Sequence, residues 1–142
     1  MIISSKGRYA IRIMVDLAEH CPVNGTPSPL KEIAQRLDIS LKYMESILTT
    51  LSKARLVEGL HGKGGGYRLT RPAAEYTVGE ILRLTEGTLC PVSCHPLENH
   101  SCPHGDSCKA LPMWQEVNKL VNDYFDGITL ASLASTNCKG ED

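Results

Sequence analysis

Residues 28–53, SPLKEIAQRLDISLKYMESILTTLSK, are the stretch that decides the fold of this 142-residue chain. Ser28 followed by Pro29 predicts the start of a helix, with Ser28 as the N-cap and Pro29 as the first helical position. Apolar residues then recur at helical spacing in two stripes, Leu30, Ile33, Ala34 and Leu37, and then Leu41, Met44, Ile47, Leu48 and Leu51. Only residues 38–40 separate the stripes. Two short amphipathic helices across so tight a turn predict a helix-turn-helix.

The next residues distinguish a DNA-binding unit from an ordinary helical hairpin. Residues 56–60, LVEGL, and 67–70, YRLT, are expected to pair as strands around the loop 61–66, HGKGGG. Glycines let a backbone approach a phosphate closely, and His61, Lys63 and Arg68 add positive or ionisable groups beside them. A nucleotide-binding loop would lead directly into a helix, and none is expected here. The pattern predicts a winged helix, a mainly α-helical protein with a small β-hairpin wing.

Two more helices complete the predicted DNA-binding domain, residues 1–87. Ser4 or Ser5 is the expected cap of the first helix, whose apolar face comprises Ala10, Ile13, Met14, Leu17 and Ala18. Thr77 and Glu80 have the spacing of a capping box at the start of the other helix, and Gly87 is its expected end.

Charge is divided unevenly along the chain. Residues 1–72 hold 11 Lys and Arg against 6 Asp and Glu, a formal +5, whereas residues 73–142 hold 4 against 10, a formal −6. The basic part suits a polyanionic partner, and two solvated faces of different charge would give the same division. No local motif suggests a nucleophile–base pair or a carboxylate pair, so we do not expect an enzyme.

Residues 88–108 form a loop rich in cysteine. Cys90, Cys94, Cys102 and Cys108 lie there among Pro, Asn, Gly and His residues, a setting that suits metal ligation or disulfide chemistry better than packing. The N-terminus lacks the apolar run of a signal peptide, and we expect a cytoplasmic protein without membrane segments, whose thiols stay reduced. The spacing matches neither the common ferredoxin runs nor zinc ribbons, so an iron–sulfur cluster and zinc both remain open, with a disulfide switch third.

A helix is expected from Lys109 onward, within a segment that extends to residue 135 and precedes a tail at 136–142. Its apolar residues alternate spacings of four and three, at Ala110, Trp114, Val117, Val121, Tyr124 and Ile128, and Met113 and Leu120 widen the face. This spacing is typical of a coiled-coil seam and predicts a dimerisation helix. The alternative is a helix packed on its own domain.

Together these segments resemble the IscR/NsrR/CymR family of bacterial winged-helix repressors. The similar stretches are SSKGRYA at 4–10, ISLKYMESIL at 39–48, GKGGGYRL at 62–69 and TVGEILRLTEG at 77–87. The resemblance implies a homodimer that binds a palindromic operator in double-stranded DNA. It also implies an iron–sulfur cluster, 2Fe–2S in preference to 4Fe–4S, held between the capping-box helix and the dimerisation helix, with zinc as the alternative.

The resemblance assigns the cluster ligands unevenly. Cys94, Cys102 and Cys108 match the family's cluster cysteines, and Cys90 is an additional thiol. The positions that supply a fourth ligand in some relatives hold residues that cannot bind iron here, namely Leu111 after the last cysteine and Arg8 and Arg12 in the first helix. The fourth ligand is therefore unassigned, with Cys90, His95, His104 and a residue from elsewhere as candidates.

The predicted DNA contacts fall into three groups. Lys6, Arg8, Lys42 and Lys53 are candidates for phosphate contacts, which set affinity and salt dependence. Ser40, Tyr43 and Glu45 lie near the start of the second helix of the helix-turn-helix, where side chains reach base edges, and the resemblance implies that Glu45 discriminates between operators. The wing is expected to contact DNA through His61, Lys63, Gly64 and Gly65.

The sequence thus predicts a homodimeric DNA-binding transcription regulator, a repressor, that senses iron–sulfur cluster or redox status through residues 88–108. Two alternatives remain. One is a regulator with a metal-free thiol–disulfide switch. The other is a small iron–sulfur carrier without a DNA role.

Overall fold

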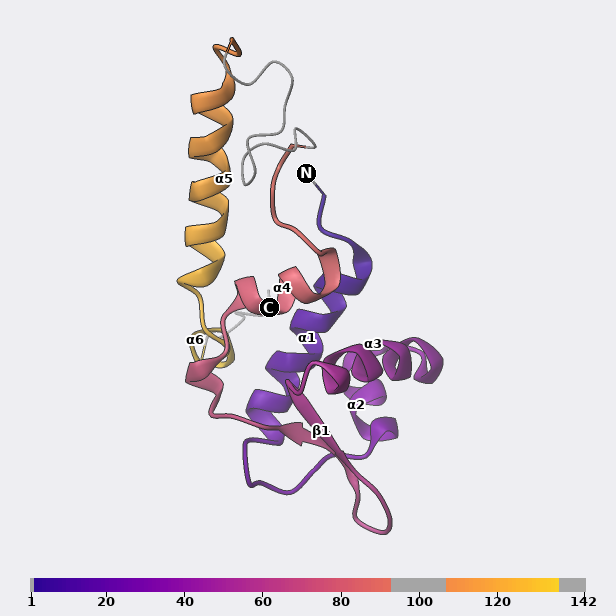
Figure 1. The fold of residues 1–142 in the computed structure, drawn as a ribbon. Coiled ribbons are helices and arrows are strands. Elements are labelled where there is room, and N and C mark those ends of the chain that lie inside the picture. Colours follow the sequence, from indigo (N-terminus) through magenta and orange to yellow (C-terminus); the bar gives the residue numbers. More distant parts are fainter. Residues whose placement is uncertain (1, 93–106, 136–142) are drawn as a thin grey trace, which may run out of the picture.

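The computed structural model describes residues 2–92 and 107–135, and the predictions for Cys94, His95, Cys102 and His104 lie outside these residues. The elements are α1 (Ser5–His20), α2 (Leu30–Leu37), α3 (Leu41–Lys53), β1 (Val57–Leu60), β2 (Gly66–Leu69), a short 3-10 helix η1 (Ala73–Glu75), α4 (Val78–Glu86), α5 (Leu111–Asp126) and α6 (Leu130–Ala134). Helices α1–α3 and the hairpin form one end of the molecule, and α5 extends away from it (Figure 1). The predicted mainly α-helical winged helix is confirmed.

One hydrophobic core holds the helix-turn-helix together. The predicted apolar faces of α1, α2 and α3 meet in it, with these residues fully buried: Ile13, Met14, Leu17, Ile33, Met44, Ile47, Leu48 and Leu51. Leu41 departs from the predicted stripe, because at the first position of α3 it lines an open hollow beside α2 and stays 49% exposed. Ser4 caps α1 by accepting a hydrogen bond from the Gly7 amide at 3.0 Å, which confirms the first of the two predicted caps.

The start of α2 is not as predicted. Pro29 is the N-cap, the helix begins at Leu30, and no side chain caps it. Ser28 is buried, and its hydroxyl accepts hydrogen bonds from the Cys21 thiol at 2.7 Å and from Arg36 at 3.1 Å. The Ser28 backbone pairs with Tyr67 of β2, at 3.1 and 2.9 Å. Residues from the end of α1, from α2 and from the wing therefore bind Ser28, the residue that the local sequence pattern predicted as the N-cap of α2.

A buried ion pair joins α2 to α1. Asp16 is 5% exposed, and Arg36 donates to both of its carboxylate oxygens, with Nε 3.0 Å from Oδ1 and Nη2 2.7 Å from Oδ2. The hydrogen bond that Arg36 donates to Asp16 raises the pKa of Arg36. A buried carboxylate needs such a partner, so the pair fixes how the helix-turn-helix sits on α1.

The wing is a two-stranded antiparallel hairpin in which Val57 pairs with Leu69 and Leu60 pairs with Gly66. Its base is tied to the segment before α4 by the fully buried Tyr76. The Tyr76 hydroxyl donates to the Leu56 carbonyl at 2.7 Å and accepts from the backbone amides of Thr70 at 3.0 Å and Arg71 at 3.1 Å.

Helix α4 begins and ends where the sequence predicts. The Thr77 hydroxyl accepts from the Glu80 amide at 3.1 Å, and Gly87 ends the helix with a φ of 81°. The capping box is only half formed, since the Glu80 carboxylate accepts a hydrogen bond from Arg71 at 2.7 Å. The ion pair with Arg71 thus connects α4 to the end of the wing.

Helix α5 packs on α4 through a second, smaller cluster. Val78, Leu82 and Leu89 are buried there against four residues from the C-terminal part of the chain, Val121, Phe125, Ile128 and Leu133. Arg83 of α4 donates to both carboxylate oxygens of Asp126 at 2.8 Å, and its hydrogen bond lowers the pKa of Asp126. After α5 the chain returns to the first core, where Leu130 of α6 is fully buried.

The prediction of a single apolar seam along α5 is wrong, and so is its start at Lys109. The helix begins at Leu111, followed by a proline in its first turn. Val121 and Ile128 pack on the molecule's own α4, whereas Met113, Leu120 and Tyr124 are 52%, 59% and 67% exposed.

Within the described residues, no helix is long and apolar enough to cross a membrane.

Candidate nucleic-acid interface

The second helix of the helix-turn-helix, α3, presents a polar face. Its buried side faces the core, and the residues on its other side are exposed: Lys42, Glu45, Ser46, Thr49 and Lys53. The Ser40 hydroxyl caps the helix by accepting from the Tyr43 amide at 3.3 Å. Lys42 and Glu45 therefore project from the first turns of α3, the part of a recognition helix that reaches base edges.

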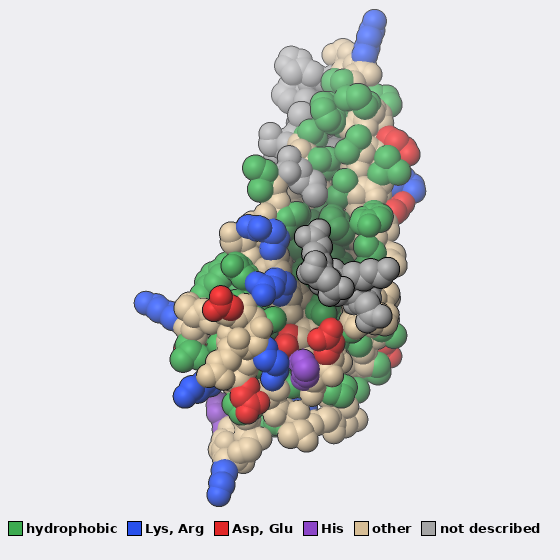
Figure 2. All heavy atoms as spheres, turned by 180° about the vertical axis from the view of Figure 1, so that it is seen from behind, with side chains coloured by type: hydrophobic (Ala, Val, Ile, Leu, Met, Phe, Trp, Pro, Cys, Tyr) green, Lys and Arg blue, Asp and Glu red, His purple; other side chains and the backbone are tan. Residues whose placement is uncertain are grey.

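Helix α1 brings one of the predicted basic residues, Lys6, to α3, whereas Arg8 lines a hollow with Val78, Leu82 and Phe125. Lys6 donates to the Thr50 hydroxyl of α3 at 3.1 Å, which leaves the other ammonium hydrogens for a phosphate. Arg8 is exposed and donates to the Ser5 hydroxyl at 3.2 Å. Lys and Arg side chains gather along one side of the half of the molecule that holds the winged helix (Figure 2).

Tyr43 is packed more than the sequence suggested. Its ring meets the Tyr9 ring of α1 edge to face, with the centroids 5.5 Å apart. Arg12 lies over the same Tyr9 ring at 5.4 Å and donates to the Leu37 carbonyl, at the end of α2, at 3.0 Å. The two tyrosines and the arginine thus connect α1 with both helices of the helix-turn-helix.

The wing carries His61 and Lys63 on an exposed loop. Gly62 and Gly64 have φ angles of 92° and 79°, which other residues adopt only with strain, so the tip depends on glycine. At the base of the wing, Arg68 donates to Glu58 at 2.6 Å and to the Gly25 carbonyl at 3.1 Å. Arg68 is therefore committed to holding the hairpin on the loop after α1.

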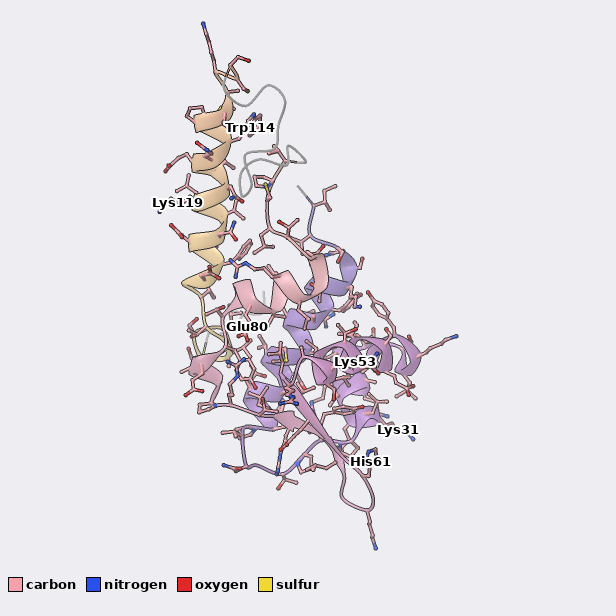
Figure 3. The ribbon with its side chains drawn as sticks, viewed as in Figure 1. Lys31, Lys53, His61, Glu80, Trp114 and Lys119 are labelled. Atoms are coloured by element: carbon pink, nitrogen blue, oxygen red, sulfur yellow. The ribbon has the colours of Figure 1, made fainter. Side chains whose placement is uncertain are left out.

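The structure also brings an additional lysine to this region. Lys31, at the second position of α2, is exposed and lies, like the wing residue His61, in the half of the molecule opposite Trp114 and Lys119 on α5 (Figure 3). In the sequence, Lys31 is only a charged residue outside the apolar stripe of α2. Every solvent-exposed helix has such residues, so the sequence did not single it out.

Two of the four clustered cysteines lie in the described part of the chain. Cys90 and Cys108 are free and half-buried, and the Cys90 thiol donates to the Val92 carbonyl at 3.2 Å. Cys90 follows Leu89, which is buried against α4, and the Cys108 carbonyl accepts a hydrogen bond from Leu111 in the first turn of α5 at 3.2 Å. No metal-binding group of three His, Cys, Asp or Glu residues occurs within residues 2–92 and 107–135.

A helix-turn-helix with an exposed polar second helix, followed by a glycine-rich basic hairpin, defines a winged-helix DNA-binding protein. The family model Rrf2, described as an iron-dependent transcriptional regulator, matches residues 3–136. The chain belongs to the Rrf2 family of transcription regulators.

Individual relatives agree with this placement. The chain is 36% identical over 137 residues to the HTH-type transcriptional regulator IscR of Aliivibrio salmonicida, covering 96% of this chain and 79% of that protein. The structure of CymR, the global cysteine regulator of B. subtilis, is similar with a TM-score of 0.77 and 33% identity, covering 96% of this chain and 99% of that one. The oxidised form of Staphylococcus aureus CymR is similar with a TM-score of 0.72 and 32% identity, over 96% and 98% of the two chains. The protein is therefore a DNA-binding regulator and not an enzyme.

Proposed function

We propose that the protein is a homodimeric repressor whose cysteine segment, residues 88–108, senses an iron–sulfur cluster. In this proposal residues 1–87 bind a palindromic operator, residues 109–135 supply the dimer contact, and residues 136–142 are a tail. What supports a sensing role most directly is the position of the cysteine segment, since it joins α4 to α5 and both helices pack on each other.

The exposed stripe of α5 supports a dimer. Met113, Val117, Leu120 and Tyr124 alternate spacings of four and three and lie about 90° around the helix from the face that packs on α4. Hydrophobic side chains extend along α5 in the space-filling view (Figure 2). An exposed apolar stripe of this length, in addition to the apolar face already packed on α4, is typical of a contact surface.

An apolar groove on α1 is a suitable counterpart. It is lined by Ile3, Ile11, Val78, Leu82 and Phe125, with Arg8 and Arg12 at its edge, and encloses about 480 Å³. The stripe on α5 is flanked by Glu116 and by Asp123, which pairs with Lys119, so Glu116 is the carboxylate that complements the two arginines beside the groove. We propose that the α5 stripe of a second copy covers this groove.

The donor set of the cysteine segment suits an iron–sulfur cluster. Cys90, Cys94, Cys102 and Cys108 would supply thiolates, the soft ligands that such clusters and zinc favour, and the two described cysteines are free and only half-buried. When bound, a cluster supplies a redox-active centre whose gain, loss or oxidation is the signal. The residues of this chain would carry that signal through the two ends of the segment, Leu89 packed on α4 and the Cys108 carbonyl bonded to α5.

DNA affinity can respond because α5 is connected to the wing through the chain that follows it. The Val78 amide donates to the Ile128 carbonyl at 2.9 Å, and the Leu130 amide donates to the Tyr76 carbonyl at 3.1 Å. Tyr76 in turn holds both strands of the wing through its hydroxyl. A shift of α5 would therefore move the DNA-binding surface. DNA affinity changes if the signal stabilises either the shifted or the unshifted conformation.

Anaerobic purification with iron and acid-labile sulfide analysis tests the proposal. We expect a coloured protein that loses its visible absorption in the Cys94→Ser, Cys102→Ser and Cys108→Ser variants and keeps it in Cys138→Ser. Gel-shift assays on an operator selected from random duplexes should give different affinities for loaded and cluster-free protein. A colourless protein with stoichiometric zinc after anaerobic reconstitution with iron and sulfide would contradict the cluster.

A metal-free thiol–disulfide switch is the second candidate. It is favoured by the similarity to S. aureus CymR, for which a crystal structure of the oxidised form exists. This alternative predicts that an oxidant changes the gel shift of iron-free protein in the presence of a chelator, and that a reductant reverses the change.

A further inference from the structure

The lysine at the start of α2 is well placed for DNA but lies outside the predicted contacts. Lys31 is exposed, and within the described residues it makes no hydrogen bond or ion pair with another side chain. Its neighbour Glu32 faces Arg36 instead, at 4.0 Å. The ammonium group of Lys31 is therefore available to an external anion.

Two hollows locate Lys31 relative to the DNA-reading elements. Lys31 lines a hollow of about 290 Å³ together with Leu41, the first residue of α3 and the neighbour of Lys42. The residues just before it, Pro29 and Leu30, line a second hollow of about 230 Å³ together with His61 and Gly65 of the wing. Lys31 thus lies between the first turn of α3 and the residues that border the wing, and Figure 3 shows Lys31 and His61 in the same half of the molecule.

One carboxylate shares the first hollow with Lys31. Asp38 follows α2 and lies seven residues after Lys31, which corresponds to about 10 Å along the helix axis. At that separation in water the attraction to Lys31 is weak, and no ion pair forms between them. The Asp38 carboxylate therefore does not prevent a phosphate from binding at Lys31.

We propose that Lys31 binds a phosphate of the DNA strand that passes between the recognition helix α3 and the wing. This inference rests on the DNA-binding role and extends it to a third element, α2. The contact adds affinity without reading sequence and fixes the angle at which α3 enters the groove.

The test is the salt dependence of binding to a 30-base-pair duplex of arbitrary sequence, measured by fluorescence anisotropy on the full chain. We expect Lys31→Gln to reduce the slope of log K against log salt by about 0.9 for each copy bound, and Lys31→Arg to keep the wild-type slope. Lys119→Gln is the matched control, since it removes the same charge from exposed α5 at the other end of the molecule (Figure 3).

Equal slopes for Lys31→Gln, Lys119→Gln and wild type would overturn the assignment while leaving DNA binding intact. A wild-type protein without salt-dependent DNA affinity would overturn the DNA-binding role itself. Circular dichroism of Lys31→Gln should match wild type, because the side chain is exposed and touches no core residue through a hydrogen bond.

Discussion

At the scale of the residue, a few side chains hold together parts that are distant in sequence. Asp16 with Arg36 connects α1 to α2, Tyr9 with Tyr43 connects α1 to α3, and Tyr76 connects the wing to the segment before α4. Each of these contacts uses a polar group or a ring that is at least partly removed from water. For the hydrogen-bonded contacts of Asp16 and Tyr76, removing one partner lowers the free energy of unfolding by more than the net contribution of the bond, because the other partner is left buried without a hydrogen bond.

The Tyr76 hydroxyl gives a prediction at this scale. Tyr76→Phe keeps the buried ring but leaves the Leu56 carbonyl and the Thr70 and Arg71 amides without their partner. We expect the free energy of unfolding to fall by about 1–3 kcal/mol in urea denaturation. Tyr67→Phe is the control, because within the described residues the Tyr67 hydroxyl makes no hydrogen bond while its ring packs on the core, and its loss should change the value by less than about 0.5 kcal/mol. Equal midpoints for the two variants would refute the role given to Tyr76.

At the scale of the element, the important junction is that between α4 and α5, which flank the cysteine segment. It combines the apolar cluster of Val78, Leu82 and Phe125 with the bidentate pair of Arg83 and Asp126. The apolar part is insensitive to pH, whereas the pair depends on an ionised Asp126.

Arg83 lowers the pKa of Asp126 through its hydrogen bond, and this sets the sign of a pH effect. A carboxylate with a lowered folded-state pKa adds stability above its ordinary value near 4, and this contribution is lost as pH falls through the folded-state pKa. Asp126 is 44% exposed, so Asp126→Asn should cost at most about 1 kcal/mol at pH 7 and nothing near pH 2. A difference in urea stability that is equal at both pH values would contradict this.

At the scale of the whole molecule, α5 has three faces: one packed on α4, one polar, and one apolar and exposed. The exposed face and the groove edged by Arg8 and Arg12 are different surfaces of the same chain, and Phe125 of α5 lines the groove. Two copies related by a two-fold axis could satisfy both surfaces at once and would present two recognition helices to one duplex.

The stripe on α5 gives the prediction at this scale. Leu120→Glu places a charge in its centre, and we expect sedimentation to shift from dimer to monomer and operator affinity to fall by at least tenfold. Gln115→Glu adds the same charge to an exposed position on another face of α5 and should remain dimeric. A Leu120→Glu protein that sediments like Gln115→Glu would show that the stripe is not the dimer contact.

Patterns within a few residues predicted most of the fold. The helix-turn-helix, the wing, the caps at Ser4 and Thr77 and the end of α4 at Gly87 all follow from periodicity, cap chemistry and the freedom of glycine. The same local signals brought the cysteine segment and the exposed residues of α3 to notice. They succeed because hydrogen bonds of caps and turns, and the face of an amphipathic helix, are decided by neighbours in sequence.

The packing of the whole chain, which local patterns do not contain, determines which distant residues each of these side chains contacts. Ser28 has the chemistry of a cap, but Cys21 and Arg36 bind its hydroxyl. The apolar residues of α5 suggested one seam, but α4 covers part of them and leaves the rest exposed. Lys31 is an ordinary surface lysine until α3 and the wing flank it. The sequence by itself thus determined the elements and the class of protein. The packing determined which side chains are used up in holding them together and which remain free to bind.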